Sequence, residues 1–253
     1  MRLIVITQNE PFYLRSNLEY LISILPKEHQ VVGCIVNSVS PFGKKETFLE
    51  KSIKTYKTFG LKFFIYYALK FIVAKVFSKS INTFLKDNGI TAIELKSSVN
   101  SNHSIETIKS FKPDLLVSIL GNQIFKKALL DLAPKGCINL HTALLPKYRG
   151  LMPTFWVLKN NEKNTGVSVF FVDEGIDSGP IIVQTEVEIG NRTQKELIIH
   201  TKKLGMEAIA KSIDLIEKNE VKLIVNDACK KSYYTFPTRQ DVLEFKNNGK
   251  RFF

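Results

Sequence analysis

The chain has 253 residues, a length that fits one large domain or a domain with a small appendage. Hydrophobic residues make up 44% of it, which excludes a disordered chain and is enough for a substantial core. The formal net charge of +12 favours anionic partners such as phosphates, nucleotides, nucleic acid or an anionic membrane surface, although scattered lysines are more often solvated surface.

The chain begins with a pattern typical of a βαβ unit. Leu3–Thr7 and Gln30–Asn37 are short apolar runs that predict buried strands. Between them, apolar residues recur with helical spacing over Leu14–Leu25, and Pro26 ends that helix. The order strand, helix, strand predicts a parallel sheet, and the apolar start is too short for a signal peptide.

The next two segments are unusual. Ser38–Gly60 is polar and lysine-rich, whereas Leu61–Ser78 is strongly apolar but too short and too lysine-punctuated for a stable membrane span. Lys62, Lys70 and Lys75 do not share one helical face. We expect a helix that packs against the sheet or another subunit. The alternative is a membrane-surface or partner-binding element whose lysines reach outward.

Alternating elements continue toward the C-terminus, typical of an open, mostly parallel α/β sheet flanked by helices, which binds ligands beyond the carboxyl ends of its strands. Predicted helices are Ser80–Asp87, Ser104–Phe111, Pro153–Lys159, Thr193–Lys218 and a short one within Gly121–Leu132. Predicted strands are Ala92–Leu95, Asp114–Leu120, Cys137–Thr142, Gly166–Val172 and Pro180–Ile189. We expect a domain over residues 1–218 and a C-terminal extension over 219–253, whose aromatic stretch forms a strand pair, a dimer contact or a base-stacking surface.

Several common signatures are absent. The sequence has no G-x-G, P-loop, G-x-S-x-G or H-E-x-x-H motif. His29, His103 and His200 lack metal-ligand spacing, so no metal site is predicted. Cys34 and the other two cysteines are far apart and form no C-x-x-C, which indicates a reducing, cytoplasmic compartment and argues against disulfides or zinc.

Polar residues gather near the ends of two predicted strands. Asn139 and His141 are two residues apart, so their side chains point to the same face of a strand. An acidic, glycine-bracketed loop follows at Asp173–Gly179. Separately, these features are often a capped strand and a solvated turn. Together, an amide, an imidazole and a carboxylate form a site that polarises a carbonyl and moves a proton, with the substrate's own amine as nucleophile.

These residues carry a family resemblance. The stretches GCINLHTALLPKYRG and TGVSVFFVDEGIDSGPI resemble the formyltransferase family that uses N10-formyltetrahydrofolate, which includes glycinamide ribonucleotide, methionyl-tRNA and nucleotide-sugar formyltransferases. Asn139, His141, the Leu144-Leu145-Pro146 turn and the Asp177-Ser178-Gly179 motif fill the family pattern, with 177 − 141 = 36 residues between the last two anchors. The resemblance extends over Lys112–Glu188, and it implies the Rossmann-like formyltransferase fold.

The resemblance also implies roles. Asn139 would donate to the formyl oxygen, a protonated His141 would stabilise the oxyanion, and Asp177 would hold His141 charged and take the amine's proton. N10-formyltetrahydrofolate would be the formyl donor, with no metal. Residues expected to line its pterin slot are Gly121, Gln123, Ile124, Phe125, Asp173, Gly175 and Ile176. The chain departs from many relatives at Phe170, where they have histidine, and at Thr142-Ala143.

The acceptor is inferred by elimination. The loop Gln8–Phe12 lacks the glycine-rich phosphate cradle expected for glycinamide ribonucleotide. The 253 − 218 = 35 residues after Lys218 are expected to be too few for the C-terminal domain of methionyl-tRNA formyltransferases. Formyltetrahydrofolate hydrolases usually have an extra N-terminal regulatory domain, which this sequence lacks, so a hydrolase is not favoured either. An amino sugar remains, expected to be nucleotide-linked. Candidate substrate contacts are Asn9, Arg15, Lys147 and Arg149, and for each cation a solvated surface position is the competing interpretation.

Alternatives stay open from the sequence. One is a formyltransferase for another amine, or a formyl-folate hydrolase. Another is a basic binding protein on a retired enzyme fold, against which the intact Asn139, His141 and Asp177 set argues. We expect a small-molecule substrate, no nucleic-acid partner and a homodimer, since the apolar Leu61–Phe77 segment and the C-terminal tail both favour self-association.

Overall fold

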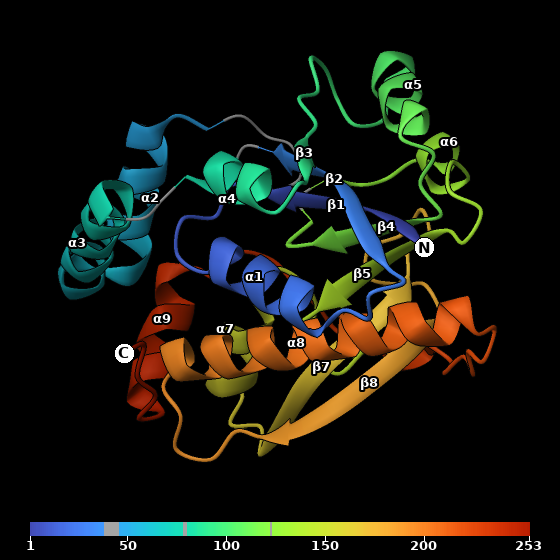
Figure 1. The fold of residues 1–253 in the computed structure, drawn as a ribbon. Coiled ribbons are helices and arrows are strands. Elements are labelled where there is room, and N and C mark those ends of the chain that lie inside the picture. The colour runs from blue at the N-terminus through green and yellow to red at the C-terminus, as the bar shows by residue number, and fades with distance from the viewer. Residues whose placement is uncertain (38–45, 78–79, 122) are drawn as a thin grey trace.

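The centre of the protein is a seven-stranded sheet with helices on both faces (Figure 1). The structure is a computed structural model that describes residues 1–37, 46–77, 80–121 and 123–253. The strand order is β3-β2-β1-β4-β5-β7-β8. The first five strands in this order are parallel to one another, β7 is antiparallel to β5, and β8 is antiparallel to β7. The strands are β1 (Arg2–Gln8), β2 (Gln30–Asn37), β3 (Thr91–Ala92), β4 (Leu115–Ile119), β5 (Cys137–His141), β7 (Asn164–Phe171) and β8 (Ile181–Glu188). The predicted Rossmann-like sheet is confirmed.

Alternation along β1 divides the core into two layers. Leu3 and Val5 belong to a cluster shared with the first and eighth helices, while Ile4 and Ile6 point to the opposite face, toward the fifth and sixth helices. Burial of both faces explains why the strand reads as a continuous apolar run. The helices around the sheet are α1 (Leu14–Ile24), α4 (Ile81–Asp87), α5 (Asn102–Ser110), α6 (Lys127–Leu130), α7 (Pro153–Lys159) and α8 (Gln194–Glu217).

The expected capping box of α8 is present. Thr193 Oγ1 accepts a hydrogen bond from Glu196 N at 3.2 Å, and the Glu196 carboxylate accepts one from Thr193 N at 2.8 Å. Reciprocal capping satisfies backbone donors that a helix start otherwise leaves unpaired. A helix of 24 residues therefore begins at a sequence-encoded point and crosses the sheet beside β5, β7 and β8.

A helical hairpin at the edge of the molecule differs from the sequence prediction (Figure 1). α2 (Phe48–Phe59) lies within the stretch read as polar, of which residues 38–45 are outside the described residues. α3 (Leu61–Phe77) packs on α2 and on C-terminal aromatic residues. Of its two expected partners the sheet is therefore wrong, and another subunit stays a prediction. Among the described helices, none is both long and apolar enough to cross a bilayer.

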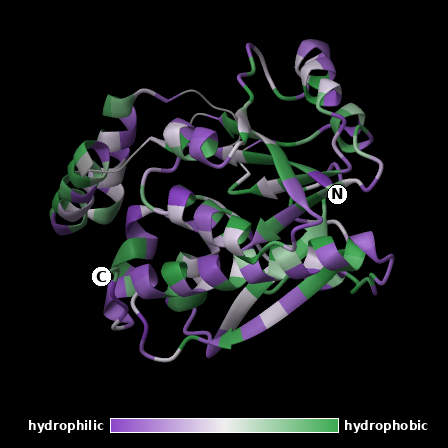
Figure 2. Ribbon diagram, viewed as in Figure 1, coloured by the Kyte–Doolittle hydropathy of each residue, from purple (hydrophilic) through white to green (hydrophobic). Residues whose placement is uncertain are grey.

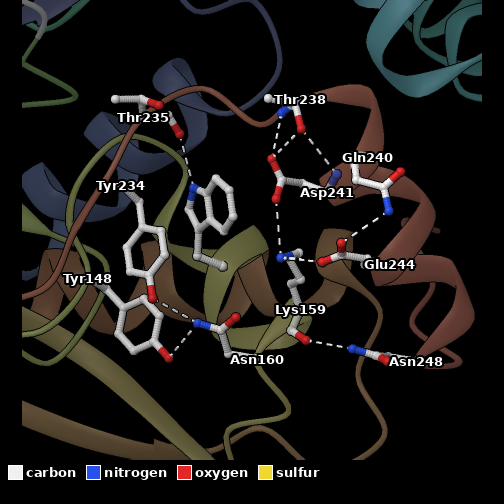
Figure 3. Close-up of polar contacts among 11 residues, drawn as sticks. Tyr148, Lys159, Asn160, Tyr234, Thr235, Thr238, Gln240, Asp241, Glu244 and Asn248 are labelled. Atoms are coloured by element: carbon white, nitrogen blue, oxygen red, sulfur yellow. Dashed lines mark hydrogen bonds and ion pairs between the residues drawn. The ribbon is translucent and has the colours of Figure 1, made fainter.

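The C-terminal residues pack as part of the molecule. β9 (Tyr233–Tyr234) pairs in parallel with β6 (Arg149–Gly150), which confirms the expected strand pair, and α9 (Arg239–Asn247) follows without having been predicted. The indole Nε1 of Trp156 donates to Thr235 O at 3.1 Å, and Lys159 Nζ lies 3.2 Å from Asp241 and 2.8 Å from a second carboxylate on α9 (Figure 3). The extension over 219–253 is thus bound to α7, and the boundary at 218 stays a prediction.

A glycine on β7 is required by close packing. A Cβ atom at Gly166 would collide with the carbonyl oxygen of Thr185 on β8 and lie 2.6 Å from Leu144 Cδ2. Because overpacking costs about 1–3 kcal/mol, we expect Gly166→Ala to lower the free energy of unfolding by about 2 kcal/mol in urea titrations. Asn164→Ala at the exposed end of the same strand is the control, with an expected change below about 0.5 kcal/mol. Equal stability of the two variants would contradict this account.

Candidate active site

A pocket of about 260 Å³ opens beyond the carboxyl ends of β1, β4 and β5. β1 lies between β2 and β4. From β1, the chain adds β2 and β3 on one side of the sheet and then β4 and β5 on the other, so the strand order reverses beside β1. Open α/β sheets bind ligands at such a reversal because the loops leaving neighbouring strands separate there. The expected location of the site at these strand ends is therefore reproduced by the fold.

The turn after β5 is held from beneath by β7 and β8. Ser168 Oγ donates to Ala143 O at 2.7 Å and accepts from Leu145 N at 3.0 Å. Gln184 Nε2 donates to Leu145 O at 2.9 Å and to Ser168 Oγ at 2.9 Å. These bonds fix the chain direction just past His141, so the imidazole is held by a rigid support.

His141 and Asp177 meet in the pocket although 36 residues separate them. His141 Nδ1 lies 3.5 Å from Asp177 Oδ2, and both side chains are nearly buried. Asp177 Oδ2 also accepts a hydrogen bond from Gly150 N at 2.8 Å. Gly150 has a φ of 96°, and a Cβ atom there would collide with Tyr234 O, so glycine is needed for this contact. The carboxylate is thus oriented before any ligand binds.

Geometry also restricts the protonation of His141. Its Nε2 lies 2.7 Å from Tyr148 O. A carbonyl oxygen only accepts hydrogen bonds, so Nε2 carries a proton. Nδ1 is then the ring nitrogen that faces the carboxylate of Asp177, 3.5 Å away.

Asn139 has an unused polar group. Its Oδ1 is buried and has no hydrogen-bond partner among the described residues. Buried polar atoms in native proteins nearly always have a partner, so this oxygen is suited to accept a hydrogen bond from an N–H or O–H group of a bound ligand, which would leave the amide NH2 free to donate. Asn139 lines the pocket together with His141 and Asp177, and the structure thus brings all three predicted catalytic residues to one site.

Two loops form the remaining predicted wall. The seven residues expected there all line the pocket: Gly121, Gln123, Ile124, Phe125, Asp173, Gly175 and Ile176. Within the second loop, Asp173 Oδ1 accepts hydrogen bonds from Gly175 N at 3.0 Å and Ser178 Oγ at 2.6 Å. This carboxylate is therefore occupied in shaping the loop, whereas the carboxylate of Asp177 faces His141.

The predicted substrate contacts do not reach this pocket. The described lining includes Gln8, but not the neighbouring Asn9, nor Arg15 or Lys147. Arg15 lies over the ring of Phe84, with its Cζ 5.9 Å from the ring centroid. A residue that is close to a motif in the sequence can still point away from the site. The geometry therefore does not support Asn9, Arg15 or Lys147 as substrate contacts.

Arg149 has a different position from the one expected. It is only 6% exposed, and its Nη2 donates to Asn226 Oδ1 at 2.7 Å rather than facing the pocket. Asn226 Nδ2 in turn donates to Asp177 O and to Gly179 O, both at 2.9 Å. Asp177 has a φ of 48°, in the left-handed region. The Arg149–Asn226 pair therefore stabilises the loop that carries Asp177 in this unusual conformation.

Sequence reasoning missed a buried lysine in the pocket. Lys202 on α8 lines the pocket and is 9% exposed, and its Nζ lies 5.4 Å from the ring centroid of Tyr13. Burial lowers the pKa of Lys202, and the negative charge of Glu10 partly opposes that shift. A lysine four residues before Met206, on the buried face of an amphipathic helix, was the available signal.

The three cysteines and one cluster of titratable side chains are not part of the described pocket lining. Cys34 and Cys137 are buried, Cys229 is exposed, and all three are free thiols. Glu28, His29 and Asp214 approach one another within 4.8 Å, but none of them lines the pocket.

Known formyltransferases are similar to this chain in sequence. The sequence model described as "Formyl transferase" matches residues 68–213. A methionyl-tRNA formyltransferase of Alkaliphilus oremlandii is 41% identical over 149 residues, covering 55% of this chain and 48% of the relative. One from Kosmotoga olearia is 36% identical over 186 residues, covering 71% and 58%. The chain spans about half the length of the curated relatives it matches.

A solved structure supports the fold along nearly the whole chain. The N-formyltransferase of Helicobacter canadensis, determined in complex with folinic acid and dTDP-3-aminofucose, superposes with a TM-score of 0.60 at 20% identity. The match covers 99% of this chain and 80% of the other. With a family model that spans more than half of the sequence and the motif residues assembled in one pocket, the chain belongs to the formyl transferase family.

Proposed function

We propose that the protein transfers a formyl group from N10-formyltetrahydrofolate to the primary amine of an amino sugar, most simply one linked to a nucleotide. The observation that carries the transfer is the assembly of Asn139, His141 and Asp177 at one pocket of a family member. The donor would supply an activated formyl carbon. The chain supplies hydrogen-bond donors for the formyl oxygen and a carboxylate that accepts a proton.

Each of the three residues has one task in this proposal. Asn139 donates from its amide nitrogen to the formyl oxygen. His141, protonated at both nitrogens, turns Nδ1 toward the negative charge that develops on that oxygen as the amine attacks. Asp177 accepts the proton that the amine loses, directly or through water, while Gly150 N keeps its carboxylate in place. The new bond joins the amine nitrogen to the formyl carbon as the bond to the donor's N10 breaks. The proton that Asp177 accepted is passed to N10, directly or through water, so that tetrahydrofolate leaves as the neutral amine.

The two pocket loops are the proposed donor slot. Phe125 at the end of the first loop is buried, and Asp173 orders the second loop through two hydrogen bonds. Such walls suit a planar pterin, whose edge would form hydrogen bonds with groups that line the slot. The folinic acid in the Helicobacter canadensis enzyme supports this assignment by analogy of fold.

Lys202 supports an anionic acceptor. A lysine that is buried beside a pocket is stabilised when an anion binds next to it, because the pair recovers part of the lost hydration energy. The diphosphate of a nucleotide-linked sugar would supply that anion. The phosphates of methionyl-tRNA would do so as well, and that second candidate is favoured by the identity of the curated relatives.

An acceptor panel separates these functions. The purified protein is incubated with N10-formyltetrahydrofolate and with nucleotide-linked 3-amino or 4-amino sugars, with methionyl-tRNA, or with no acceptor. We expect loss of free amine and tetrahydrofolate release only with an amino sugar. Turnover with methionyl-tRNA alone would support the second candidate. Turnover without an acceptor would indicate a hydrolase, and no turnover in any arm would support a binding protein on a retired fold.

The loop contact at Asn226 gives a further prediction. We expect Asn226→Ala to reduce kcat by about 10- to 100-fold with little change in acceptor KM, because a small displacement of a catalytic group costs that much. Asn247→Ala, at an exposed position on α9 in the same extension, is the control and should have wild-type kcat. An Asn226→Ala enzyme with unchanged kcat would show that Asp177 keeps its place without this contact.

A further inference from the structure

The hairpin of α2 and α3 carries an apolar surface that the described structure leaves uncovered. Six aliphatic residues of α3 are exposed, with fractions from 48% to 66%: Leu61, Ile65, Leu69, Ile72, Val73 and Val76. At 3.6 residues per turn, their spacing places them within about 120° of the helix circumference. Figure 2 shows apolar segments along both helices of the hairpin at the edge of the molecule. We call these six residues of α3 the hairpin face.

The other side of α3 is firmly attached to the body. Phe63 stacks on Phe59 with ring centroids 4.3 Å apart, and Tyr66 stacks on Phe253 at 3.9 Å. Lys70 Nζ donates to Tyr13 Oη at 2.9 Å. Since aromatic and polar contacts already use this side, the helix cannot turn its hairpin face inward without breaking them. Large exposed apolar patches on stable proteins mark interaction sites.

The charge of the hairpin indicates what covers that face. Residues 46–77 contain six lysines and two glutamates, a net charge of 6 − 2 = +4. Glu46 forms an ion pair with Lys54 at 3.0 Å, and Glu50 caps the start of α2 through Thr47. On α3, Lys62 and Lys75 are exposed beside the hairpin face. An apolar stripe with lysines next to it matches a surface that is apolar inside and anionic outside.

We propose that the hairpin face binds the surface of an anionic lipid bilayer. The aliphatic side chains would enter the boundary between headgroups and acyl chains, while Lys62 and Lys75 would reach the lipid phosphates. A second copy of the chain would bring two such basic surfaces together across a two-fold axis, and their lysines would repel one another. Nucleic acid would pair with the lysines but leave six aliphatic side chains in water. The bilayer is the partner that satisfies both parts of this surface.

Attachment of the hairpin also relates the membrane to the pocket. The ring of Tyr13, bonded to Lys70 on α3, lies 5.4 Å from Lys202 Nζ on the pocket wall. The hairpin face is therefore fixed relative to the acceptor side of the pocket. Binding to a bilayer does not depend on the chemistry proposed above, and it is measured without turnover.

The test is flotation of the full chain with phosphatidylcholine vesicles that contain or lack phosphatidylglycerol. We expect binding to the anionic vesicles, weakened by salt, and little binding to the neutral ones. Lys62→Glu with Lys75→Glu should lower the partition coefficient by at least roughly five-fold per lysine. Leu69→Gln with Ile72→Gln should lower it by at least roughly ten-fold.

Matched variants elsewhere on the surface are the controls. Lys211→Glu with Lys222→Glu changes the same charge, and Leu223→Gln with Val225→Gln removes exposed apolar side chains outside the hairpin. The apolar control should bind vesicles within about two-fold of wild type. The charge control should lose only the part of the affinity that depends on the net charge of the whole protein, which the Lys62→Glu with Lys75→Glu variant loses as well. All variants should unfold thermally like wild type, since the changed side chains are exposed.

The proposal would be overturned if anionic vesicles bound no protein, or if neutral and anionic vesicles bound it equally. Equal loss of binding in the control variants would also overturn it. In the absence of vesicle binding, a dimer in light scattering that Leu69→Gln with Ile72→Gln dissociates would identify a second copy as the partner. RNA binding that Lys62→Glu with Lys75→Glu abolishes would instead identify nucleic acid.

Discussion

Asp177→Asn is expected to reduce kcat for formyl transfer by at least about 1000-fold while the protein stays folded. The amide keeps the size of the carboxylate but cannot accept the amine's proton or balance the charge of an imidazolium. General-base catalysis and the electrostatic support of His141 are lost together, so the two effects combine in one variant. The measurement is single-turnover formylation of the best acceptor from the panel, with saturating donor.

A second acid in the same loop provides the control for this result. Glu174 is exposed and does not line the pocket, so Glu174→Gln removes a negative charge without touching His141. We expect its kcat to stay within about two-fold of wild type. Comparable rates for Asp177→Asn and wild type would disprove the assigned role of Asp177. Equal losses in both variants would instead point to the charge of the loop.

Lys202→Met is expected to raise the acceptor KM by about 10- to 100-fold. A hydrogen bond between two charged groups is worth about 1.5–3 kcal/mol, and methionine fills similar space without a charge. Donor KM should be unchanged, because the proposed donor slot lies on the loops at Gly121–Phe125 and Asp173–Ile176. Lys202→Arg should recover part of the affinity, which a purely structural position would not show.

The same substitution should stabilise the fold. Burial lowers the pKa of Lys202, so the folded protein holds the charged form less favourably than the unfolded chain does. The resulting penalty is present below the folded-state pKa and disappears as pH rises through it toward the usual 10.5. We therefore expect Lys202→Met to raise Tm at neutral pH, with the difference from wild type shrinking as the solution becomes alkaline.

The affinity for the acceptor should fall as pH rises, whereas the stability penalty from Lys202 is relieved. The proposed contact requires charged Lys202, so affinity in the wild type should fall at a pH below 10.5 as the lysine loses its proton. The Lys202→Arg variant should keep its affinity through that range, because arginine remains protonated. Identical alkaline profiles for the two proteins, measured by acceptor titration, would show that Lys202 does not contact the acceptor.

Much of the fold was encoded in local patterns. Alternation of apolar runs and helical spacing predicted the parallel strands β1, β2, β4 and β5, and the Thr193–Glu196 spacing predicted the start of α8. Two helices were missed. α2 and α9 are short and rich in lysine or polar residues, and tertiary packing rather than intrinsic propensity stabilises helices of this length.

The position of α3 shows a different limit. Its sequence is apolar on most sides, and such a helix is usually buried. In the structure its aromatic side packs on α2 and the C-terminal residues, while its aliphatic side is exposed. Helical periodicity describes which side chains share a face, but it does not say which of two apolar faces the rest of the chain will cover.

By itself, the sequence determined which polar residues meet at the pocket: an amide and an imidazole two residues apart on one strand, and a carboxylate in an Asp-x-Gly loop. Strand alternation and turn chemistry are local, so they can be read from neighbouring residues. Only the tertiary structure decided that Arg149 turns to Asn226, that Lys202 enters the pocket, and that the hairpin face stays uncovered. Those outcomes depend on pairing between distant segments, whose geometry is settled when the sheet, α8 and the C-terminal extension pack together.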